Sequence, residues 1–177
     1  MNNKIVRNMH IIGGIFTILF GSLLHFTFEL SGYWKPLAII SAVNESTWEH
    51  LKLAFWPTLI FAIIEYFIYG KKYKNFIFGK TISLYAMPIL ISVIFWGYLK
   101  VINDSLIWDI LDFVISVVIG YVISYFIIVS KKYFKVWKTI SFFLLVIIII
   151  SFCLLTFFPM NLIIFKDPIT GKFGIPK

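Results

Sequence analysis

Residues 81–99 read TISLYAMPILISVIFWGYL and contain no Asp, Glu, Lys or Arg. A helix that crosses the hydrocarbon core of a bilayer, about 30 Å thick, needs about 20 mostly apolar residues. Residues 113–130 and 139–165 form similar runs without a charged side chain. These stretches therefore predict membrane-spanning helices rather than parts of a soluble core.

The composition of the chain indicates the same class of protein. Of its 177 residues, 60% are hydrophobic and only 14% are charged, and the mean hydropathy is +0.94. A soluble domain usually has about 25% charged residues, so a soluble globular domain and a disordered chain are both excluded. A secreted disulfide scaffold is excluded as well, because the single cysteine, Cys153, cannot form an internal bridge.

Working outward from residues 81–99, we find further apolar runs separated by turn residues or clusters of Lys. We predict an all-α integral membrane bundle of five transmembrane helices, which forms one domain over residues 1–158. The expected spans are residues 9–29, 47–69, 81–101, 105–129 and 137–158. Residues 159–177 are expected to form a tail outside the membrane, which either folds over the outer end of the bundle as a lid or lies at the membrane interface.

The charge distribution predicts the orientation of the chain. The formal net charge is +8, and ten basic residues fall on one side of the predicted spans: Lys4, Arg7, Lys71, Lys72, Lys74, Lys80, Lys131, Lys132, Lys135 and Lys138. Short loops rich in Lys and Arg stay in the cytoplasm, so we expect the amino terminus inside and the carboxyl terminus outside. These residues can contact anionic lipids at the inner face, and no nucleic-acid partner is needed.

Two predicted spans carry a row of small and polar residues along one face. In the first span, Gly13, Thr17, Gly21, His25 and Glu29 recur every four residues. Small residues permit the close approach of another helix, while His25 and Glu29 place polar atoms near the outer end. A packing seam without further function is the alternative interpretation.

The fourth span carries Asp109 and Asp112, one turn apart, followed by Ser116. Two carboxylates on one face repel each other unless a cation, a proton or a basic side chain lies between them. Ionisable groups inside a bilayer are costly and usually have a function. An interfacial, solvated Asp109 near a helix amino terminus is the alternative.

Residues 44–52, Asn-Glu-Ser-Thr-Trp-Glu-His-Leu-Lys, contain the densest group of functional side chains. Ser46 and Glu49 have the spacing of a capping box, in which each side chain binds the backbone N–H of the other residue. The capping box leaves Asn44, Glu45 and His50 without an explanation. Lys52 is available as a counter-ion for a carboxylate.

Together these residues predict a polar pocket that faces outward. We expect Glu45, Glu49 and Asp112 to be catalytic, His25, Glu29 and His50 to bind a divalent metal such as zinc, and Asn44, Trp48, Asp109, Ser116 and Asp167 to line the pocket. Two histidines with a carboxylate leave an open position on zinc for water. Glu65 lies in the inner half of the second span, where it is either neutral or paired with Lys from the inner loop.

The pattern Asn-Glu-Ser-x-Trp-Glu-His-Leu-Lys resembles that of an uncharacterised family of small bacterial, mainly Firmicute, polytopic membrane proteins. The resemblance covers most of the chain, including His25, Glu29 and a tail similar to residues 165–168 followed by Gly171 and Gly174. It implies a multi-pass protein of the bacterial cytoplasmic membrane and points to Asn44, Glu45, Glu49 and His50. It implies no reaction.

Three functions are compatible with these patterns. The first is a metal-dependent hydrolase or transferase that acts on a lipid or a lipid-linked substrate. The second is a protein that binds or transports a cation, a proton or a small solute, with Glu65 continuing the path inward. The third is a structural or accessory subunit of a membrane complex. Because a His-Glu-x-x-His motif and a recognisable serine-nucleophile motif are both missing, the sequence leaves enzymatic activity open.

Overall fold

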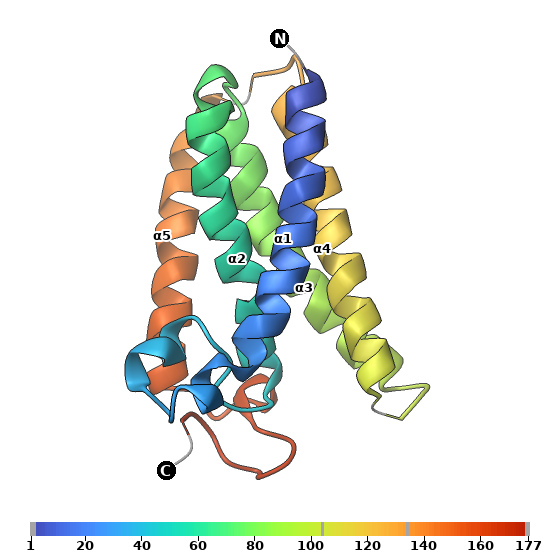
Figure 1. Ribbon diagram of the computed structural model, residues 1–177, viewed down its shortest axis with the longest axis vertical. Coiled ribbons are helices and arrows are strands. Elements are labelled where there is room, and N and C mark those ends of the chain that lie inside the picture. The colour runs from blue at the N-terminus through green and yellow to red at the C-terminus, as the bar shows by residue number, and fades with distance from the viewer. Residues whose placement is uncertain (1–2, 104, 134, 176–177) are drawn as a thin grey trace.

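The computed structural model describes residues 3–103, 105–133 and 135–175, and its long elements are helices (Figure 1). In chain order they are α1 (Asn3–Leu30), α2 (Thr47–Ile68), α3 (Phe76–Tyr98), α4 (Leu106–Val129) and α5 (Lys135–Phe157). Short 3-10 helices follow α1, α2 and α5: η1 (Lys35–Ile39), η2 (Gly70–Lys72) and η3 (Ile163–Phe165). All five long helices are long and apolar enough to cross a membrane, so the predicted all-α architecture with five long apolar helices is confirmed.

The two ends of the chain lie at opposite ends of the bundle (Figure 1). The connection between α1 and α2, which contains η1, and the tail after α5 gather at the end that carries the carboxyl terminus. We call this end the outer end, following the orientation that the charge distribution predicts. The outer end therefore brings together residues 31–46 and the tail.

The inward face of α1 is built for close packing against α2. Its buried residues are Val6, His10, Gly13, Thr17, Gly21, Leu24 and Phe28. A Cβ atom added to Gly21 would overlap the backbone carbonyl of Leu53 in α2. The missing side chain of Gly21 therefore allows the two backbones to touch one turn before His25.

The predicted row of residues at every fourth position follows the inward face of α1 only as far as Gly21. Each step of four residues rotates about 40° around a helix of 3.6 residues per turn, so Glu29 lies about 80° beyond Gly21. The inward face continues instead through Leu24 and Phe28. His25 is left partly exposed at the edge of this face, and Glu29 is exposed.

The inner half of the bundle contains a buried ionic network. Glu65 of α2 pairs with Lys80 of α3, and both side chains are almost completely buried. Tyr69 donates a hydrogen bond of 2.7 Å to Glu65 Oε1, and His10 Nδ1 of α1 lies 3.3 Å from the same oxygen. His10 Nε2 lies 3.1 Å from the hydroxyl of Ser124 in α4. Of the two interpretations of Glu65, the structure confirms pairing with Lys, and it places that Lys within α3.

A second buried ion pair anchors the outer end. Lys52 Nζ lies 2.5 Å from Glu49 Oε2 and donates hydrogen bonds to the carbonyl of Ala38 in η1 and to the hydroxyl of Thr156 in α5. Glu49 Oε2 also accepts a hydrogen bond of 3.0 Å from the backbone N–H of Val43. The pair thereby connects α2 with η1, α5 and the end of the α1–α2 connection.

The contact between α1 and α2 predicts that Gly21→Ala destabilises the bundle. The added methyl group meets a backbone carbonyl that cannot move independently, and overpacking of this kind typically costs about 1–3 kcal/mol. The free energy of unfolding, measured by denaturation in detergent, should fall by that amount. Gly97→Ala is the matched control, because a Cβ at Gly97 has no other atom within 4 Å. Equal stability of the two variants would contradict the close contact.

Candidate functional site

The outer end contains a cavity of about 530 Å³ among α1, α2, α3 and α4. Its polar lining includes His25, Glu45, Thr47, His50, Asp109 and Asp112. Apolar side chains such as Phe26, Phe95 and Phe113 line the rest, and Pro168 and Ile169 of the tail complete it. The cavity thus combines a compact polar group with a large apolar surface.

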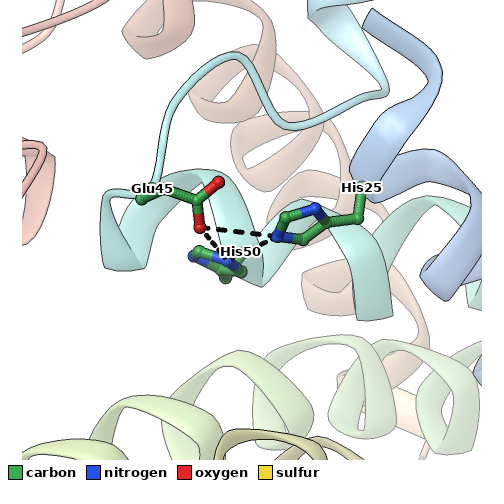
Figure 2. Close-up of side chains that lie close together, drawn as sticks. All are labelled: His25, Glu45 and His50. Carbon is green, nitrogen blue, oxygen red and sulfur yellow. Dashed lines mark hydrogen bonds and ion pairs between the residues drawn. The ribbon is translucent and has the colours of Figure 1, made fainter. Parts of the chain in front are cut away.

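Three side chains from separate segments meet at this cavity (Figure 2). His25 comes from the last turns of α1, His50 from the first turn of α2, and Glu45 from the connection between these helices. His25 Nε2 lies 3.0 Å from His50 Nε2. Glu45 Oε2 lies 3.5 Å from His25 Nε2 and 3.3 Å from His50 Nε2. Three atoms that can bind a metal therefore converge on one point.

The orientation of the His50 ring is set by the backbone. His50 Nδ1 lies 3.0 Å from the carbonyl oxygen of Ser46, which can only accept a hydrogen bond. Nδ1 therefore carries a proton, and in the neutral ring Nε2 presents its lone pair to Glu45 and His25. A histidine that binds a metal usually donates its other ring N–H in this way.

The electrostatics of the group favour a positive charge between the three side chains. When the facing ring nitrogens carry protons, hydrogen bonds from His25 and then His50 hold the pKa of the Glu45 carboxyl well below its usual range, which outweighs the effect of partial burial. Glu45 is therefore ionised at neutral pH. Either a proton on one ring nitrogen or a metal cation can supply the opposite charge.

The backbone that carries Glu45 is fixed on both sides. Asn44 Oδ1 accepts a hydrogen bond of 2.9 Å from the backbone N–H of Ser46, and Asn44 Nδ2 donates one of 2.8 Å to the carbonyl of Gly174 in the tail. The predicted capping box is wrong, because the Ser46 side chain makes no capping hydrogen bond and Glu49 binds Lys52 and Val43 instead. Asn44 thus positions Glu45 and attaches the tail.

Asp109 and Asp112 both line the cavity, as the fourth-span pattern indicated. Asp112 is buried, and the hydroxyl of Ser116 donates a hydrogen bond of 3.0 Å to its Oδ1 atom. Tyr98 of α3 donates to Asp109 Oδ1. The hydroxyl groups hold the two carboxyl groups in defined orientations at the cavity wall.

Other predicted site residues support the cavity from outside its lining. Glu49 belongs to the buried ion pair with Lys52. The Trp48 ring packs between Phe152 of α5 and Phe165 of η3, with ring centroids 4.8 and 4.9 Å away. Both residues therefore attach the start of α2 to its surroundings. Glu29 and Glu65 also lie outside the cavity lining, the first on the exposed side of α1 and the second in the inner ionic network.

Asp167 orders the tail next to the cavity. Its carboxylate accepts hydrogen bonds from the backbone N–H of Ile169 and the hydroxyl of Thr170, at 3.0 and 2.5 Å. This turn places Pro168 and Ile169 against the cavity. Asp167 is among the residues predicted from the sequence, whereas Pro168 and Ile169 are not, although the Asp-Pro pair is a turn signal that marks the position.

Comparison with known proteins identifies the family but no activity. No curated protein and no solved structure matches the chain. Residues 1–175 match a family of unknown function, DUF6512. The match includes the residues of the outer cavity and the Asn-Glu-Ser-x-Trp-Glu-His-Leu-Lys stretch. The chain therefore belongs to this family of unknown function, DUF6512.

Proposed function

We propose that this protein is a metal-dependent membrane hydrolase or transferase, in which His25, Glu45 and His50 bind a divalent ion such as zinc. The three distances between their ligand atoms, 3.0, 3.3 and 3.5 Å, carry the proposal. Tetrahedral zinc with bonds of about 2.0–2.2 Å holds its ligand atoms about 3.3 Å apart. The triangle of ligand atoms thus has the size of one face of a zinc tetrahedron.

The donor types support the same metal. Two imidazoles and one carboxylate form a set that binds catalytic zinc and leaves a fourth position open. The side chains of His25, His50 and Glu45 are 27, 33 and 42% exposed, so a fourth ligand can reach the ion from the cavity. The hydrogen bond from His50 to the carbonyl of Ser46 supplies the outer support that such a ligand needs.

Bound zinc would act as a Lewis acid and lower the pKa of water at the open position to about 7. In our proposal Asp112 accepts the proton from the attacking water, with Ser116 holding its carboxyl group in place. The proton then passes to the leaving oxygen or nitrogen as its bond to the carbonyl carbon or the phosphorus breaks. Asp109 adds negative charge to the same wall, which stabilises a nearby cation.

The apolar part of the cavity favours a lipid or a lipid-linked substrate. Phe26 of α1 and Ile110 of α4 line the cavity, yet their side chains are 57 and 53% exposed on the apolar surface of the bundle. In a bilayer, with the outer end toward the outside, this opening faces the outer leaflet. A substrate with an ester, amide or phosphate group can therefore enter sideways from the membrane.

The contacts of Glu65 favour an enzyme over a pathway through the membrane. A transport pathway would need an inner binding group that can exchange its ligand. Glu65 instead pairs with Lys80, accepts a hydrogen bond from Tyr69 and lies next to His10, all within the buried interior. The inner network therefore has a structural role in our proposal.

Zinc binding provides the first test. The purified protein, stripped of metal by chelation and titrated with zinc, should bind one ion per chain. His50→Ala should weaken binding by more than about 100-fold, because loss of even an outer hydrogen-bond partner of a ligand costs 10–100-fold. Glu29→Gln, which changes an exposed carboxylate one turn from His25, should bind like the wild type. Folded wild-type protein that binds no zinc, or equal losses in both variants, would contradict the proposed ligands.

Hydrolysis provides the second test. Zinc-loaded protein should cleave p-nitrophenyl esters of fatty acids, or the corresponding amides or phosphates. The reaction is measured by the absorbance of the released product, which is p-nitrophenolate from the esters and phosphates and p-nitroaniline from the amides. Asp112→Asn should keep zinc and lower kcat by about 10²–10⁴-fold, the usual contribution of a general base. Full activity of Asp112→Asn would exclude this role for Asp112. If zinc-loaded wild type cleaves none of the three substrate classes, the proposed hydrolysis is wrong.

A further inference from the structure

A second hollow lies between α1 and α4, on the inner side of the outer cavity. Its volume is about 500 Å³, and apolar residues line its central part: Ile11, Gly14, Ile15, Ile18, Val118 and Val122. We call this hollow the α1–α4 groove. Ile18 lines both the groove and the outer cavity, so the two spaces adjoin along the same pair of helices.

The groove has room because Gly14 has no side chain. A Cβ at Gly14 would meet only one atom within 4 Å, Cδ2 of Tyr121, at an ordinary contact distance of 3.8 Å. Packing between the helices therefore does not require glycine here, in contrast to Gly21. Glycine is also the least favourable ordinary residue inside a helix. Its effect at this position is to leave space beside α4.

The position of Gly14 agrees with the length of a lipid chain in one leaflet. Gly14 lies about 16 Å from His25 along the axis of α1, at 1.5 Å per residue. Half of a hydrocarbon core of about 30 Å is about 15 Å. A lipid whose head group reaches His25 would therefore place the end of its chain near Gly14.

We propose that the α1–α4 groove binds the hydrocarbon chain of the substrate, which is a long-chain acyl lipid with its head group at His25, Glu45 and His50. This inference rests on the proposed function and specifies its substrate class. The chain enters between Phe26 and Ile110 and passes Ile18 toward Gly14. At its inner end the lining includes Arg7 and His10.

A photoreactive fatty acid tests this proposal. Palmitic acid with a diazirine at its methyl end is added to zinc-loaded protein in detergent, and the labelled residues are identified by mass spectrometry. Labelling should concentrate on residues 11–18 and 118–122. Gly14→Leu should reduce it at least about tenfold, because leucine takes the volume of several methylene groups of the chain. Gly97→Leu adds the same volume where no other atom lies within 4 Å and should leave the labelling unchanged.

Other outcomes separate this inference from the proposed function. Equal labelling of Phe142 and Phe143, exposed on α5, would show nonspecific coating and overturn the groove as a chain site. A second outcome would also overturn the groove as the chain site of the substrate. If Arg7→Gln loses the labelling while His50→Ala keeps it in full, the groove binds an anionic lipid from the inner leaflet. Labelling that depends on Gly14 in a protein that binds no zinc would support the chain site and overturn the metal-dependent function.

Discussion

The buried ion pair between Glu65 and Lys80 sets the arrangement of helices on which the outer cavity depends. A charge within an apolar bundle is costly unless an opposite charge and hydrogen bonds compensate it. Here Tyr69 donates to Glu65, and His10 brings α1 to the same point. Because four helices contribute to this network, their rotation and height relative to one another are defined. Removing one partner of a buried pair typically costs about 3–5 kcal/mol, so this arrangement resists sliding of one helix past another.

The same rule explains why the outer cluster differs from the rest of the bundle. Glu49 is matched by Lys52, and this pair holds the end of the α1–α2 connection against η1 and α5. Glu45 instead meets two histidines, His25 and His50, whose Nε2 atoms lie 3.5 and 3.3 Å from its Oε2 atom. The cluster therefore favours a positive charge, which either a ring proton or a metal cation can supply. Asn44 and the close contact at Gly21 keep its three parts in position.

The five long apolar helices, the polar face of α4 and the inner part of the polar row on α1 could be predicted because they depend on local hydropathy and helical periodicity. The full set of residues that meet at the outer cavity could not be predicted. Glu29 follows His25 at helical spacing, but the rotation of α1 turns it to the exterior, and Glu45 reaches the histidines through a connection whose path depends on tertiary contacts. Glu49 resembles a cap or a catalytic acid in the sequence. Its role in holding the α1–α2 connection is visible only in the structure, where Lys52 links Glu49 to η1 and α5.

A crystal structure of the zinc-loaded protein, with anomalous data collected at the zinc absorption edge, tests the proposed metal site most directly. The proposed zinc site predicts one strong anomalous peak at about 2.0–2.2 Å from Nε2 of His25, Nε2 of His50 and a carboxylate oxygen of Glu45. A peak on Glu29, or one between Asp109 and Asp112, would contradict the proposed zinc site. The absence of a peak, with His25, Glu45 and His50 still hydrogen-bonded to one another, would contradict it as well.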